Sequence, residues 1–192
     1  MRRAVITSFA VVAAVALAGC GSSGNHAGST TTPSTTTVNQ LSSPLWDKAK
    51  PTPSKSAKMV CQKEASAEIA ASIGVKETRV TTPTWDKAQH LYSCTYVYPK
   101  GKITLVVKEM STQAETTAYF DSVKQKYGIT QELKGLGQGA WVLKNNDVVV
   151  RKDYKVLLVD VHAIPANFAP SMTRSDVAVN TGVAILGCWT GA

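Results

Sequence analysis

Residues 92–109 read YSCTYVYPKGKITLVVKE, and this stretch decides the fold class. Residues 92–98 are rich in aromatic and β-branched side chains, which favour a β-strand. The segment 99–101, Pro-Lys-Gly, supplies a turn, and residues 102–109 return as a second strand. The stretch therefore predicts an antiparallel β-hairpin.

One face of this hairpin is aromatic. Tyr92, Cys94, Tyr96 and Tyr98 lie at a period of two, so their side chains share a face. We expect that face to be core or to be half-covered by a helix. If it were exposed, it would suit a glycan or a lipid head group.

The second half of the chain predicts three more strands. Residues 140–143 and 148–151 form a hairpin around Asn145-Asn146-Asp147, and residues 155–163 follow. The last segment has mostly apolar side chains on both faces, which is typical of a central strand. Gly135-Leu-Gly-Gln-Gly-Ala140 precedes a strand and not a helix, so we interpret it as a turn and not as a phosphate loop.

Three helices complete the pattern, over residues 59–73, 112–127 and 174–186. Gly74 and Gly128 end the first two, and Ser111 or Thr112 caps the second. The order α-β-β-α-β-β-β-α places strands in adjacent pairs. It predicts an α+β fold with an antiparallel sheet of about five strands and helices packed on it.

The N-terminus predicts export. Arg2 and Arg3 precede a short apolar stretch that ends in Leu17-Ala18-Gly19-Cys20. These four residues resemble the bacterial lipobox, in which the cysteine is alkylated with diacylglycerol and the preceding peptide is removed. We therefore expect residues 1–19 to be a signal peptide and the mature protein to begin at a lipidated Cys20. Two acyl chains suffice for stable membrane anchoring.

A polar linker follows. Ser, Thr, Pro and Gly make up 22 of the 38 residues from 21 to 58. Such a segment buries too little apolar area to fold, so residues 20–58 are predicted to tether one α+β domain over residues 59–192.

The positive charge does not indicate nucleic-acid binding. The chain carries 21 Lys and Arg against 13 Asp and Glu, a net charge of +8. Loss of Arg2 and Arg3 leaves +6, of which the linker carries half. A nucleic-acid-binding domain would concentrate that charge on a folded face.

Three cysteines remain after Cys20. Secretion favours a disulfide, and an odd number leaves one thiol over. We favour the pair Cys61–Cys94, which would join the first helix to the first strand. The alternative pair, Cys61–Cys188, would join the first and last helices.

Catalytic motifs are missing from the sequence. It contains no Gly-x-Ser-x-Gly, Ser-x-x-Lys or His-Glu-x-x-His segment and no Cys-x-x-Cys pair. We therefore expect no cofactor and no metal. Asp86, Asp160 and Glu109 are weak candidates for an acid–base pair. His26, His90 and His162 do not form a cluster, and Arg151-Lys152-Asp153 is interpreted as a solvated hairpin tip.

Several segments together carry a family resemblance. They are the lipobox 17–20, Cys61, Cys94, the motifs 135–140 and 148–152, and Cys-Trp-Thr-Gly at 188–191. The chain resembles small cell-envelope lipoproteins of actinobacteria, of the mycobacterial type, assigned to domains of unknown function. Gly-x-Gly-x-x-Ala followed by Val-x-Val-Arg-Lys is also similar to extracellular sensor domains of mycobacterial Ser/Thr kinases. The resemblance implies location and fold but no catalytic residues.

These observations predict a protein anchored by lipid at the extracytoplasmic face of the cell membrane. We expect a non-enzymatic domain that binds a ligand or a protein partner, with no nucleic-acid partner. The alternative is an enzyme or accessory factor that acts on envelope glycans or lipids. Two carboxylates facing each other in a cleft would favour that alternative, whereas a shallow surface with exposed apolar side chains would favour a protein partner.

Overall fold

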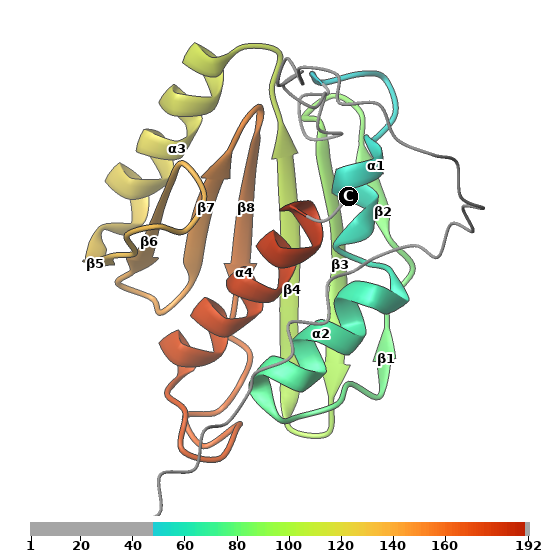
Figure 1. Cartoon of the computed structure of the whole chain (residues 1–192), viewed down its shortest axis with the longest axis vertical. Helices are drawn as coiled ribbons and strands as arrows, with labels where there is room; N and C mark the ends of the chain where they lie inside the picture. The colour runs from blue at the N-terminus through green and yellow to red at the C-terminus, as the bar shows by residue number, and fades with distance from the viewer. Residues whose placement is uncertain (1–47, 191–192) are drawn as a thin grey trace, which may run out of the picture.

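A computed structural model describes residues 48–190 (Figure 1). The predicted signal peptide, Cys20 and linker residues 21–47 lie outside the described residues. The helices are α1 (Lys55–Met59), α2 (Lys63–Ile73), α3 (Gln113–Tyr127) and α4 (Arg174–Thr190). The strands are β1 (Arg79–Val80), β2 (Thr84–Asp86), β3 (Leu91–Tyr98), β4 (Gly101–Glu109), β5 (Ile129–Glu132), β6 (Gly139–Leu143), β7 (Val148–Lys152) and β8 (Lys155–Asp160).

The fold is α+β and every strand pairing is antiparallel, as predicted. The sheet has eight strands in the order β1-β3-β4-β8-β7-β6-β5, with β2 also paired to β3. The prediction of about five strands was therefore too low. The five predicted strands are present, and the three missed ones, β1, β2 and β5, have only two to four residues and lie at the two edges. Strands this short carry no clear alternation of apolar residues.

The central position of β8 follows from its apolar faces. It lies between β4 and β7. Leu157, Val159 and Val161 point to one core cluster, whereas Val156 and Leu158 point to the other. Each cluster is sealed by helices, so a strand with two apolar faces is stable only in this inner position.

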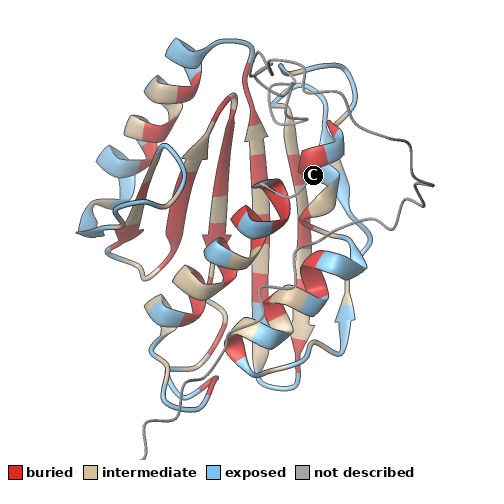
Figure 2. Cartoon of the chain, in the orientation of Figure 1, coloured by how far each residue is buried: buried red, intermediate tan, exposed pale blue. Residues whose placement is uncertain are grey.

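The larger core lies under α1, α2 and α4, which cross the same face of the sheet (Figures 1 and 2). The predicted aromatic face belongs to it: Tyr92, Cys94, Tyr96 and Tyr98 are all buried. The Tyr98 ring packs edge-on against Phe168, with 5.0 Å between ring centroids. The core interpretation of this face is confirmed, and no aromatic surface is left there for a glycan.

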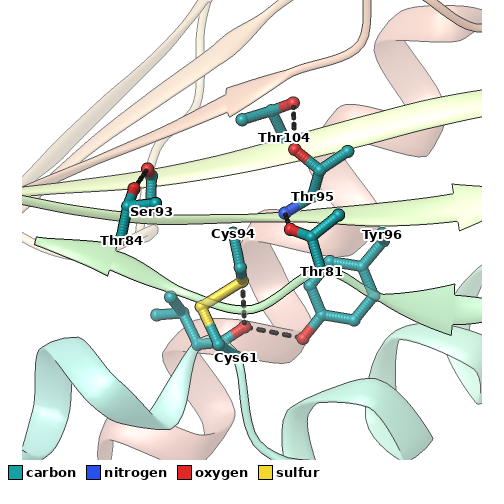
Figure 3. Close-up of a disulfide and its surroundings, with 9 residues drawn as sticks. Cys61, Thr81, Thr84, Ser93, Cys94, Thr95, Tyr96 and Thr104 are labelled. Atoms are coloured by element: carbon teal, nitrogen blue, oxygen red, sulfur yellow. Dashed lines mark hydrogen bonds between the residues drawn. A yellow bond between two sulfur atoms is a disulfide. The ribbon is translucent and has the colours of Figure 1, made fainter.

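Of the described helices, α3 is the one that covers the opposite face, where it packs over β6, β7 and β8. Phe120 of α3 stacks on Trp141 of β6 at 3.9 Å between ring centroids. Thr112 caps α3 as predicted, because its side chain accepts the Glu115 N–H while the Glu115 carboxylate accepts the Thr112 N–H. The β3–β4 part of this face has no helix over it among the described residues. It presents Ser and Thr hydroxyls that bond to one another, including Thr84 to Ser93 and Thr95 to Thr104 (Figure 3).

The first predicted helix, over residues 59–73, begins later than predicted, at Lys63 in α2, and ends at Ile73. A separate short helix that the sequence did not predict, α1, precedes it over Lys55–Met59. The Ser54 hydroxyl accepts the Ala57 N–H and caps α1. Ser56 and Ala57 are fully buried, so residues 54–58, which the sequence assigned to the linker, pack as part of the domain. Their Ser, Lys and Ala composition resembles the linker, which is why composition could not place this boundary.

The disulfide joins Cys61 and Cys94, the pair that the sequence favoured (Figure 3). Their Cα atoms are 6.0 Å apart. The bond attaches the α1–α2 junction to β3, and the Tyr96 hydroxyl reinforces it by donating to the Val60 carbonyl at 2.6 Å. Cys188 is a buried thiol in α4.

Replacement of Cys61 and Cys94 by Ser should therefore destabilise the domain. The bond closes a loop with a sequence separation of 33, for which the chain-entropy model gives about 4 kcal/mol. We expect the free energy of unfolding in urea to fall by about that amount. Reductant should destabilise the wild-type protein and leave the Cys61→Ser/Cys94→Ser variant unchanged. Equal sensitivity of both proteins to reductant would contradict this disulfide.

Candidate functional site

The three carboxylates proposed from sequence do not meet. Glu109 points into the core beneath α1, at the end of β4. Asp160 lies on β8 opposite Thr104, which comes five residues before Glu109 in β4. Asp160 is therefore on the other face of the sheet from Glu109. Asp86 is exposed on the edge strand β2. No two of these candidates form an acid–base pair in the structure.

Glu109 instead belongs to a buried polar cluster. Its carboxylate lies 4.0 Å from Lys155 Nζ, and both side chains are fully buried. The Ser54 hydroxyl donates to Glu109 Oε1, and the Ser54 N–H points at the same carboxylate from 3.4 Å. Ser56 Oγ lies 3.1 Å from Ser54 Oγ. Since the cluster is enclosed, we interpret it as a structural lock between α1 and the β4–β8 pair.

Loss of one charge from this buried cluster should strongly destabilise the domain. Lys155→Met leaves the Glu109 carboxylate buried without its cation, so we expect the free energy of unfolding to fall by about 3–5 kcal/mol. The double variant Glu109→Gln/Lys155→Met removes both charges and should be more stable than the single variant. Urea denaturation of the four proteins of this cycle measures the difference. Additive effects would contradict the pairing.

A second buried carboxylate lies at the opposite end of the sheet. Asp147 accepts the Val161 N–H at 2.8 Å and the Asn145 side-chain amide at 2.6 Å. The pKa of Asp147 is raised to about 6, mainly by burial and also by the negative charge of Asp160, while these hydrogen bonds and His162 lower it and limit the rise. The arrangement stabilises the β7 and β8 ends.

This pKa sets a pH dependence of stability. The folded protein binds the Asp147 proton more tightly than the unfolded chain, whose carboxyl has the ordinary pKa of 3.8. Stability from this group is therefore full below about pH 4 and is lost as the pH rises to about 6, by up to about 3 kcal/mol. Asp147→Asn should flatten the slope, which urea titrations between pH 4 and 7 will measure. An unchanged slope would contradict the shifted pKa.

The histidines remain apart. His162 is 72% exposed, and its Nδ1 lies 2.5 Å from Asp160 Oδ1. His90 stacks on Trp85, whose indole N–H donates to the Pro51 carbonyl at 3.0 Å. His26 lies outside the described residues. Over residues 48–190, no group of His, Cys, Asp and Glu is arranged to hold a metal ion.

Two further segments are structural. Residues 135–138 form the turn predicted before β6, and Gly137 has a φ of +62° against the Arg151 carbonyl, where a Cβ would lie 2.6 Å from the oxygen. The prediction of a solvated tip at residues 151–153 was wrong for Asp153, which is buried. Its N–H donates to Gln138 Oε1 at 2.8 Å, and its carboxylate accepts from Gln138 Nε2. The polar groups of Gln138 and Asp153 are therefore satisfied by hydrogen bonds to each other.

The best candidate site is a groove between α4 and the β5–β6 connection, which we call the edge groove. It has a volume of about 490 Å³ and is open to solvent. Its lining residues are Gln131, Glu132, Leu133, Lys134, Gly135, Leu136, Val179 and Val183. Gln131 and Leu133 reach it because they lie opposite Val142 and Ala140, which face α4.

Exposed apolar side chains lie at the β5 edge of the sheet, and one of them lines this groove. Val183 on its α4 wall is 50% exposed. Ile129 in β5 and Tyr127 just before it are 37% and 36% exposed. Among the described residues these are the large hydrophobic side chains with the most exposure: Ile129 belongs to β5, Tyr127 precedes it, and Val183 lines the same groove as residues of β5. A cluster of this kind marks an interaction surface more often than scattered exposed residues do.

Sequence reasoning missed the edge groove because it missed β5. One signal was present in α4. Val177, Ala178, Ile185 and Trp189 are fully buried, and helical periodicity places Val183 away from that row. A valine on the outward side of a helix suggests a surface contact, although periodicity alone does not say against what.

Comparison of the chain with protein-family models, with curated proteins and with solved structures finds no match. Within residues 48–190, none of the helices combines the length and apolarity needed to cross a bilayer.

Proposed function

We propose that this chain is a membrane-anchored envelope lipoprotein whose domain binds a protein partner through the edge groove, without catalysis. The observation that carries the proposal is the exposure of Val183, Ile129 and Tyr127 at the β5 edge of the sheet, with Val183 on the wall of an open groove. A pocket for a lipid or a small molecule would bury most of the surface of its ligand. A shallow apolar surface with a polar rim is better suited to another protein.

The location rests on the lipobox Leu17-Ala18-Gly19-Cys20. A diacylated Cys20 would hold the protein at the extracytoplasmic face of the membrane. From residue 21 to residue 47 the linker has 27 residues, and a flexible chain of that length spans roughly 30 Å. The domain would therefore reach partners in or close to the same membrane. The resemblance to envelope lipoproteins supports the same location.

Replacement of Cys20 by Ser tests the anchor. The thiol is the acceptor for diacylglycerol, so Cys20→Ser should move the protein from the membrane fraction to the soluble or secreted fraction. The control is Cys188→Ser, which changes a buried thiol and should leave the protein in the membrane. Immunoblots of both fractions and the intact mass of the N-terminal peptide measure the outcome. A Cys20→Ser protein that stays in the membrane would count against lipid anchoring.

A photo-crosslinking amino acid at position 183 tests the partner. We expect a covalent adduct with one protein in cells that express the full chain, identified by mass spectrometry. The matched control places the same amino acid at Lys102, which is exposed on β4. An adduct of equal yield at both positions would argue against the edge groove. Copurification of a stoichiometric lipid or glycan in native mass spectrometry, with no protein adduct, would favour the enzyme or small-ligand alternative.

A further inference from the structure

We propose that the partner binds as an extended strand that adds to β5 and so enlarges the sheet. The partner segment has alternating apolar side chains and acidic residues at its ends. This inference rests on the proposed function and names the partner's chemistry. Four features of the edge lead to it: its position, its backbone, its apolar neighbours and its charge.

The two edges of the sheet differ. At one edge, β1 and β2 share β3 as their neighbour, and they have two and three residues. Pro83, which has no N–H, lies between them, so this edge cannot present a continuous row of donors. At the other edge, β5 is a single strand of four exposed residues. In the described part of the chain, β5 pairs only with β6.

The backbone of β5 presents hydrogen-bonding groups outward. The Leu133 N–H donates to the Ala140 carbonyl at 2.9 Å, which makes these two residues a hydrogen-bonded pair of the ladder. In an antiparallel ladder such pairs alternate with pairs whose N–H and C=O groups point away from the partner strand. Glu132, opposite Trp141, is the next residue and belongs to the second kind. Its N–H and C=O therefore point to the open side of β5.

Apolar side chains flank this edge on both faces of the sheet. Val183 and Leu133 lie on the α4 face, where they line the edge groove. Ile129 lies opposite Leu143, which belongs to the core under α3, so Ile129 is on the other face. Successive side chains of an added strand point to opposite faces. One such strand would cover both sets of residues, which a helix lying in the groove would not do.

The surrounding charge selects an acidic partner. Lys134 lines the groove. Lys144 packs against Gly128, just before β5. At the end of α3, Lys124 lies over the Trp141 ring and Lys126 over the Tyr127 ring, both at 4.9 Å. Glu132 is the single opposing charge within β5 itself. Glutamates at the ends of a bound strand would meet these lysines and raise the association rate at low salt.

The first test uses synthetic peptides with the full-length mature chain, labelled with ¹⁵N. The probe alternates Val and Thr and carries two Glu at each end. We expect saturable NMR shifts of the amides in residues 129–134 and of Val183. Methylation of alternate peptide nitrogens, which removes the donors of one edge, should weaken binding at least about tenfold. A peptide with Lys in place of Glu should bind several-fold more weakly, and this difference should shrink in salt. Shifts confined to other parts of the domain, or equal binding of the methylated peptide, would overturn the proposal.

The second test uses the edge itself. Glu132→Pro removes the outward N–H, whereas Glu132→Ala removes the same charge and keeps that N–H. With the folding of both variants checked by circular dichroism, Glu132→Pro should lose probe binding and the crosslink at position 183. Glu132→Ala should retain both. A partner that still crosslinks at position 183 in Glu132→Pro would leave partner binding in place and show that strand addition is wrong. A dimer abolished only by Glu132→Pro would assign the edge to a second copy and also overturn the proposal.

Discussion

The antiparallel pairing of β4 with β8 is the contact on which the rest of the structure depends. It brings residues 104–109 against residues 155–160 and joins the β1–β4 part of the sheet to the β5–β8 part. This pairing closes a loop of about 45 residues, which costs chain entropy. Burial of apolar side chains on both faces of β8 offsets that cost. The buried ion pair Glu109–Lys155 lies at the end of the β4–β8 ladder. Its hydrogen bond from Ser54 holds the start of α1 against these strands.

Helices cover the two faces of this sheet unequally. Three helices and the disulfide close one face, whereas α3 closes only part of the other. A sheet covered in this way has two kinds of surface left. Over β3 and β4 it shows hydroxyl groups that satisfy one another, as expected of a face in contact with water. At β5 it leaves apolar side chains exposed next to an open groove.

Much of the fold could be predicted because long elements have strong local signals. The alternation in β3 and β4, the two apolar faces of β8 and the capping box of α3 all follow from residues close together in sequence. The short strands could not be predicted this way, because two to four residues carry no measurable period and form only where a neighbouring strand offers a ladder. The break between α1 and α2 contains Cys61, whose partner Cys94 is 33 residues away in β3.

The sequence by itself determined the α+β class, the five long strands, the order of the long helices and the prediction of a lipid-anchored envelope protein. These depend on composition and on local periodicity, which act within a few residues. Only the tertiary structure decided which cysteines meet, that Glu109 and Asp160 lie on opposite faces, and that Val183 lines one groove with residues of β5. These facts depend on pairings between residues tens of positions apart, and side-chain chemistry alone does not specify such distances.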